Sequence, residues 1–150
     1  MAYSTLTDLT RWIEETELVR LCSSDPAADI DSDEVAEVAA EAIASADSQI
    51  DGYLLGRWPA LRGYLPVPAE INRISSLLAL YNLYLRRRSV TEQWQAAHDE
   101  CSARLKAAAE GYVNLGLTEA GDTADSARPA YRTDADEDDR KITDQALDRL

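Results

Sequence analysis

The chain has 150 residues, 45% of them hydrophobic, which is enough for one domain with a buried core and too little for two domains of ordinary size. Its 28 acidic residues outnumber 15 basic ones and give a net charge of −13, which argues against a protein that grips DNA or adheres to an anionic membrane. No run of about 18 apolar residues occurs, and the first ten residues lack the basic and apolar regions of a signal peptide. We therefore expect a soluble protein made in the cytoplasm.

The first 22 residues carry the spacing of amphipathic helix. Thr5 or Thr7 is suited to cap a short helix, and apolar residues then recur every three or four positions, at Leu6, Leu9, Trp12 and Ile13. A second stretch over residues 14–22 places Leu18, Leu21 and Cys22 on one side. This stretch either continues the first helix or breaks from it near Thr16.

A long helix is predicted after the polar loop SSDPAADIDSD. Ser32 or Asp33 is a suitable cap, acidic residues follow in the first turn, and the helix should run to about Leu55. Its apolar face consists of Val35, Val38, Ala39, Ala42, Ile43, Ala46, Ile50 and Tyr53 or Leu54. Because many of these residues are alanines, another helix can approach this one closely.

The connector, residues 57–68, reads RWPALRGYLPVP and is too apolar for an ordinary surface turn. Such a segment either folds back on its own helices or is covered by another chain, because contiguous exposed apolar patches usually mark binding surfaces. The second alternative predicts an interface with a neighbouring subunit or another protein, made by Trp58, Leu61, Tyr64 and Leu65.

Two further helices are predicted after the connector. Pro68 suits the start of a central helix whose wide apolar face includes Ile71, Ile74, Leu77, Leu78, Tyr81 and Leu85. This helix ends at Arg86, Arg87 and Arg88, whose cations oppose the negative end of the helix dipole or contact another subunit. Ser89 and Glu92 match a capping box for the last helix, which carries Trp94, Ala97, Cys101, Leu105, Ala108 and Tyr112 and ends near Gly111 or Gly116.

These elements predict an all-α fold, a compact bundle of about four to five helices with an extended C-terminal tail. The helical domain should span residues 1–115, and the acidic tail residues 116–150. The tail has too few large apolar residues to fold alone, so we expect it to order only on a partner or to remain disordered. Its candidate contact residues are Tyr131, Ile142, Leu147 and Leu150.

The Asp, His and Cys residues that could act in catalysis or bind a metal form no catalytic or metal-binding pattern. Asp25, Asp29, Asp31 and Asp33 resemble the start of a calcium loop, but Glu34 and Ala40 stand where that loop needs glycine and glutamate. His98 is the only histidine, and its neighbour Asp99 lies on a different helical face. Cys22 and Cys101 are expected to be reduced, partly buried thiols. We therefore predict that the protein is not an enzyme and has no metal or cofactor.

The order of motifs resembles the small Mu-like prophage neck protein family, which is encoded beside the major head protein. The match lies in MAYSTLTDL at the start, in DSQIDGYLLGRW before the connector, and in Pro66, Pro68, Tyr81 and Tyr84 after it, and covers about residues 1–115. Trp58 replaces the usual tyrosine, and Gly63 and Tyr64 extend the loop, while the tail after Thr118 lies outside the resemblance.

This resemblance implies a head-tail connector, an adaptor whose copies form a ring, expected to be a dodecamer, below the portal protein at the phage neck. Its partners would be other copies of itself, the portal protein and a downstream neck or tail-completion protein, with no membrane. DNA would pass through the lumen without specific binding, which agrees with the acidic composition. The protein would be found in the virion neck, and in the host cytoplasm during assembly.

A different class of protein fits the same composition. A small helical module that binds a protein or ligand through the apolar connector, without forming a ring, is the alternative that the residues leave open. The two classes differ in assembly, because an adaptor would join a portal whereas such a module would be indifferent to it.

Overall fold

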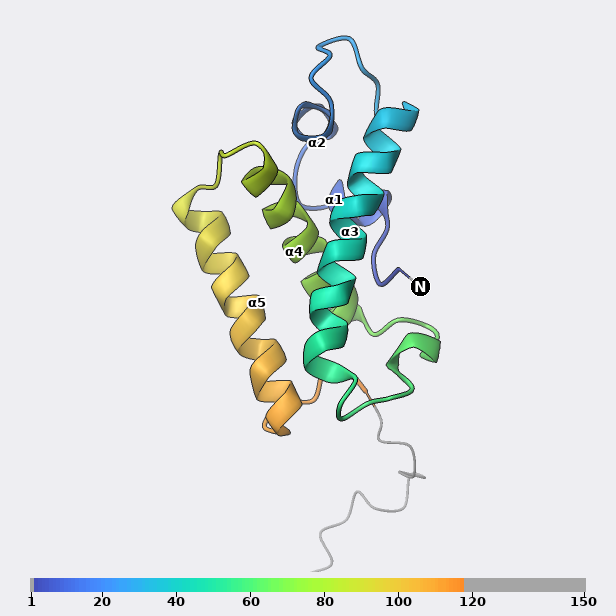
Figure 1. Cartoon of the computed structure of the whole chain (residues 1–150), viewed down its shortest axis with the longest axis vertical. Coiled ribbons are helices and arrows are strands. Elements are labelled where there is room, and N and C mark those ends of the chain that lie inside the picture. Colours follow the sequence, from blue (N-terminus) through green and yellow to red (C-terminus); the bar gives the residue numbers. More distant parts are fainter. Residues whose placement is uncertain (1, 118–150) are drawn as a thin grey trace, which may run out of the picture. The chain divides into compact units, whose positions relative to one another are not determined.

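The computed structural model describes residues 2–117, which form five α-helices and one short 3-10 helix, with no strand among them (Figure 1). This confirms the all-α prediction. The elements are α1 (Leu6–Leu9), α2 (Glu15–Cys22), α3 (Asp33–Leu54), η1 (Leu61–Gly63), α4 (Ala69–Arg86) and α5 (Glu92–Glu110). Within the described range, no helix is long and apolar enough to cross a membrane.

The most extensive contact in the fold is between α3 and α4, and α5 packs against both of them (Figure 1). Helix α4 is the central helix, as predicted, because its buried residues lie on several sides of it. Ile71, Ile74, Leu78 and Leu80 are almost fully excluded from solvent. Each such side chain contributes about 2 kcal/mol to stability. The core therefore centres on α4, with α1 and α2 packed against α3 and α4.

The N-terminal helices are separate and short. Thr5 caps α1, but α1 ends at Leu9, so Trp12 and Ile13 lie beyond it and not on its apolar face as predicted. Helix α2 begins at Glu15, and the chain therefore breaks between these two helices. Trp12 is partly exposed, and the Arg73 guanidinium lies 5.9 Å from the centre of its ring.

The ends of the longer helices follow local sequence signals in most cases. Ser32 is the N-cap of α3 and Pro68 that of α4, both as predicted. The predicted capping box of Ser89 and Glu92 is wrong, because Thr91 is the N-cap of α5. The Ser89 N–H instead donates to the Tyr84 carbonyl and closes the end of α4. Helix α5 ends at Glu110 with Gly111 as its C-cap, so Tyr112 lies past the helix and is exposed.

Candidate functional site

The connector folds back on the body of the protein. The Trp58 N–H donates to the Leu54 carbonyl at 2.8 Å, so the turn starts directly from the end of α3. The Leu61 N–H then donates to the Trp58 carbonyl, and η1 follows over Leu61–Gly63. These local bonds satisfy backbone groups that a buried loop would otherwise leave unpaired.

The four predicted interface residues of the connector differ in exposure. Trp58 is 8% exposed and Leu61 only 2%, because both side chains belong to the core. Tyr64 is partly buried against the core, whereas Leu65 is 72% exposed. Trp58 and Leu61 therefore follow the first alternative predicted for the connector, that it folds back on its own helices. A contact with another chain stays a prediction, and the surface that the connector offers for it is Leu65 with the exposed part of Tyr64.

The arginine run at residues 86–88 meets the C-terminal end of α2. Arg86 Nη1 donates to the Cys22 carbonyl at 3.1 Å, and Arg87 Nε donates to the Leu21 carbonyl at 3.0 Å. A second nitrogen of Arg87 donates to Ser24 Oγ. Arg86 lies in the last turn of α4 and Arg87 is its C-cap, as predicted, and the side chains of both residues also bind carbonyls at the C-terminal end of α2. Burial raises the pKa of the Cys22 thiol nearby, and Arg86 and Arg87 partly oppose that rise.

A buried polar network fastens the N-terminal segment, residues 2–9, to α3 and α4. The Tyr3 backbone N–H donates to Asp47 Oδ2 at 3.0 Å, and Ser75 Oγ donates to Asp47 Oδ1 at 2.7 Å. Ser4 Oγ lies 2.7 Å from Ser75 Oγ. Burial raises the pKa of Asp47, against the effect of these two hydrogen bonds. A buried carboxyl without such partners would be costly, so the network holds the segment in one position.

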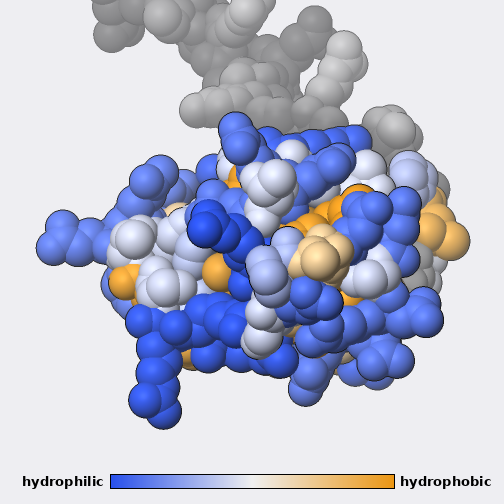
Figure 2. Space-filling view, turned by 90° about the horizontal axis from the view of Figure 1, so that it is seen from above, coloured by the Kyte–Doolittle hydropathy of each residue, from blue (hydrophilic) through white to orange (hydrophobic). Residues whose placement is uncertain are grey.

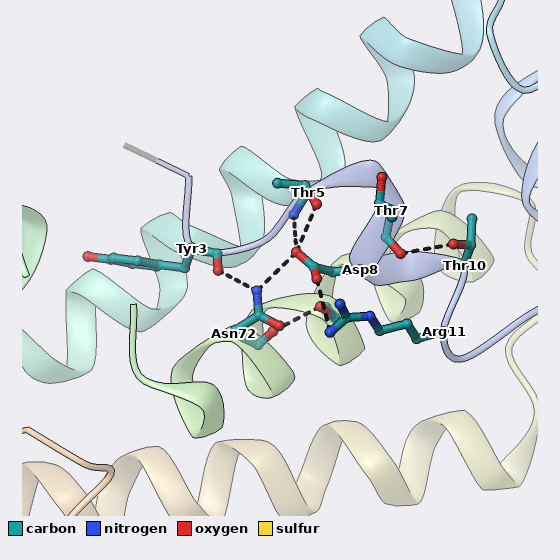
Figure 3. A network of polar contacts seen from close by, with 8 residues as sticks. Tyr3, Thr5, Thr7, Asp8, Thr10, Arg11 and Asn72 are labelled. Carbon is teal, nitrogen blue, oxygen red and sulfur yellow. Dashed lines mark hydrogen bonds and ion pairs between the residues drawn. The ribbon is translucent and has the colours of Figure 1, made fainter. Parts of the chain in front are cut away.

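The same segment is held at its other end by Asp8 and Asn72 (Figure 3). Asn72 Nδ2 donates both to the Tyr3 carbonyl at 2.9 Å and to Asp8 Oδ2 at 3.0 Å. Asp8 also accepts from the backbone N–H and the hydroxyl of Thr5. Partial burial alone would raise the pKa of Asp8, but the hydrogen bonds from Asn72 and Thr5 lower it overall. Asp8 therefore accepts these bonds as a carboxylate.

Several residues in the resembled motifs meet in this network. Tyr3 and Asp8 come from the motif at the start of the chain, and Asp47 and Asp51 come from the motif before the connector. The Tyr3 hydroxyl donates to Asp51, which also pairs with Arg62 Nε at 2.8 Å. Asp47 and Ser75 were not predicted from the sequence to be functional residues. Polar residues on the otherwise apolar buried faces of α3 and α4 were the signal that could have identified them.

The acidic loop before α3 uses its carboxylates for local backbone turns. Asp25 Oδ1 accepts from the Ala27 N–H, and Asp29 Oδ1 accepts from the Ile30 N–H at 2.7 Å. An open groove of about 750 Å³ lies between this loop and α2, with Arg20 and Arg87 in its lining. Over residues 2–117, no group of three or more His, Cys, Asp or Glu side chains is placed to hold a metal ion.

The side chains of the remaining candidate residues take no part in the hydrogen bonds of Asp47 and Asp8 described above. The His98 ring stacks on Tyr81, with 4.2 Å between the ring centres, and its Nδ1 lies 3.2 Å from Asp99 Oδ1. Cys22 and Cys101 are buried free thiols, as expected. Burial raises the pKa of Cys101 to about 11. The predicted tail contacts lie outside the described residues, namely Tyr131, Ile142, Leu147 and Leu150.

Comparison with known proteins places the chain in a phage family. A family model described as Bacteriophage Mu, Gp36 matches residues 3–133. The match extends beyond the expected limit near residue 115, so part of the acidic tail belongs to it. A search of curated proteins finds none that matches the chain. Because the family model matches most of the chain, this protein belongs to the Bacteriophage Mu Gp36 family.

Proposed function

We propose that the protein is a head-tail adaptor, a structural virion protein whose copies form a ring, twelvefold, below the portal at the phage neck. The family match over residues 3–133 carries this proposal. The organisation of the described residues supports it, because their main polar clusters hold the body together. Asp47, Asp8 and Arg87 all take part in hydrogen bonds that join separate helices or segments.

The connector supplies the surface for a neighbouring subunit or the portal. Leu65 places an exposed apolar side chain at its tip, while Trp58 and Leu61 anchor the connector to the core. An anchored loop presents its contact residue in a fixed position, which lowers the entropy that binding would cost. The tip is therefore better suited to docking than a free apolar loop.

The charges suit a protein that lets DNA pass without binding it. Seen from the end that carries α2 and the loop before α3, the surface is largely hydrophilic (Figure 2). Acidic residues on α3, including Glu34, Glu37 and Glu41, are exposed. Arg86 and Arg87 donate hydrogen bonds to carbonyls of α2, so these two arginines are poorly placed to bind phosphates.

Light scattering coupled to size exclusion tests the proposal, with the protein alone and with its cognate portal, followed by electron microscopy of large species. We expect the wild type to join the portal as a ring, and Leu65→Asp to lose that association. Leu85→Asp is the matched control, because Leu85 is 54% exposed at the end of α4, outside the connector. A fixed small dimer indifferent to the portal would contradict the adaptor role and favour a small binding module without a ring.

A further inference from the structure

Helix α3 carries a row of exposed alanines that are not packed in the core. Ala39, Ala42 and Ala46 are buried in the core, as the apolar pattern predicts. A second row consists of Ala36, Ala40 and Ala44, which follow one another at one-turn spacing and are exposed. We call these three residues the alanine row. Nothing within residues 2–117 covers it.

The alanine row forms one side of an open groove. The groove has a volume of about 640 Å³ and lies between α3 and the N-terminal segment. Ile43 and Leu6 add apolar lining, and Asp51 and Arg62 also line it. Arg62 remains exposed while its Nε pairs with Asp51.

The lining and the length of this groove suit a short helix. Small side chains let two helix backbones approach closely, and an alanine row presents a shallow surface into which larger side chains can pack. From Ala36 to Ser48 the groove follows α3 for about 18 Å at 1.5 Å per residue. The Ser48 hydroxyl donates to the Ala44 carbonyl, so it is already engaged within the helix.

The last nine residues of the chain have the pattern of such a helix. The sequence ITDQALDRL spans residues 142–150. At 3.6 residues per turn, Ile142, Ala146, Leu147 and Leu150 would share one side, while Asp144 and Asp148 would lie on the other. Nine helical residues extend about 14 Å, which is within the length of the groove.

We propose that residues 142–150 of one copy dock in the alanine-row groove of the neighbouring copy in the ring. This inference rests on the proposed function, because a ring repeats one head-to-tail contact from copy to copy. In the sequence, residues 118–141 lie between the helical body and the docking segment. These 24 residues reach up to about 80 Å when extended, which is more than the roughly 33 Å length of α3.

Cysteine cross-linking between two variants of the full chain tests this contact. One variant carries Ala44→Cys in the groove and the other Leu147→Cys in the segment, and the two are mixed before assembly on the portal. The native thiols, Cys22 and Cys101, give little background because both are buried and burial raises the pKa of each. Lys106→Cys replaces Ala44→Cys in the control mixture, since Lys106 is an exposed residue of α5.

We expect a disulfide-linked dimer in the first mixture at roughly ten times the yield of the control, because docking raises the local thiol concentration. Equal yields in the two mixtures would overturn the proposal. Cross-linking within a single chain that carries both substitutions, without cross-linking in the mixture, would overturn docking on a neighbour.

Ring formation is measured on the same samples by electron microscopy. Rings without the cross-link would leave the adaptor role standing and refute the docking of the tail. If no ring forms on the portal, the adaptor role fails, and cross-linking of the concentrated protein alone still decides the contact. Leu147→Asp is the second variant, and we expect it to weaken association between copies while the helical body unfolds at the wild-type temperature.

Discussion

Helices α4 and α5 end with the same pair of backbone hydrogen bonds but with different residues in the left-handed position. At the end of α4, the Ser89 N–H donates to the Tyr84 carbonyl, and Arg88 adopts a φ of 55°. At the end of α5, the Tyr112 N–H donates to the Ala107 carbonyl, and Gly111 adopts a φ of 89°. Both ends are Schellman motifs, in which glycine is the usual left-handed residue.

The difference shows that the end of α4, which binds the neighbouring helix α2, has a strained backbone conformation that the end of α5 avoids. An L-residue in the left-handed region costs about 1 kcal/mol, so Arg88 is a strained choice. The two residues before it hold the end of α2 through the carbonyls of Leu21 and Cys22. At the end of α5, a Cβ atom at Gly111 would lie 2.7 Å from Arg57 Nη1. Glycine at that end therefore meets both a conformational and a steric need.

Substitution of Gly111 is expected to have the largest effect. Gly111→Ala should lower the free energy of unfolding by about 2 kcal/mol, from left-handed strain and displacement of Arg57. Urea denaturation measures the change. Gly56→Ala is the control, because nothing lies within 4 Å of its added Cβ. In a double-mutant cycle, Arg57→Ala should reduce the cost of Gly111→Ala, and an unchanged cost would refute the steric part.

The pH dependence of stability distinguishes the thiols of the two regions. Burial raises the pKa of Cys101 in α5 from 9.0 to about 11, so the unfolded chain loses this proton first as pH rises. Stability should therefore fall above pH 9, by on the order of 2 kcal/mol once pH exceeds the folded pKa. Thermal unfolding between pH 8 and 10 should show a shallower loss for Cys101→Ala than for wild type. Parallel curves would contradict this assignment.

The Cys22 thiol provides the comparison for that measurement. Its pKa is also raised by burial, but Arg86 and Arg87 oppose the rise. Cys22→Ala should therefore change the slope of stability against pH less than Cys101→Ala does. Comparing slopes removes the constant cost of the cavity that each alanine leaves.

Substitution of Arg87 should distinguish the effect of its hydrogen bonds to α2 and Ser24 from the effect of losing one positive charge in the arginine run. Arg87→Ala should lower the free energy of unfolding by about 1.5 kcal/mol, because it removes hydrogen bonds from a charged group to α2 and Ser24. Arg88→Ala removes the same charge from an exposed neighbouring position and should be nearly neutral. Chemical denaturation measures both variants, and equal losses would show that charge alone is responsible.

The features of the fold that could be predicted are those that depend on residues close together in the sequence. Ser32 as a cap, Pro68 before α4 and Gly111 after α5 were all visible from local residue types. The partners of Arg86 and Arg87 were not predictable, because the carbonyls of α2 approach them only in the folded chain. The capping prediction at Ser89 failed for a related reason, since Arg88 takes the left-handed position and Ser89 completes the end of α4.

The candidate site was predictable only in part, because apolar content does not say what covers a side chain. The connector was recognised from its composition, but the burial of Trp58 and the exposure of Leu65 depend on how the loop turns after α3. Asp47 gave only a weak signal, as a single carboxylate on the buried face of α3. Its partners Tyr3 and Ser75 come from distant parts of the chain, and pattern analysis over short windows does not detect such contacts.

The smallest expected effect is a gain, obtained by giving α4 the residue that already ends α5. Arg88→Gly should raise the free energy of unfolding by up to about 1 kcal/mol, because it relieves left-handed strain at a position whose side chain is exposed. The extra freedom of glycine in the unfolded chain opposes part of this gain. Arg88→Ala is again the control, since it removes the charge but keeps the Cβ atom. If glycine proved no more stabilising than alanine in chemical denaturation, strain would not distinguish the two helix ends, and the glycine at α5 would be explained by Arg57 alone.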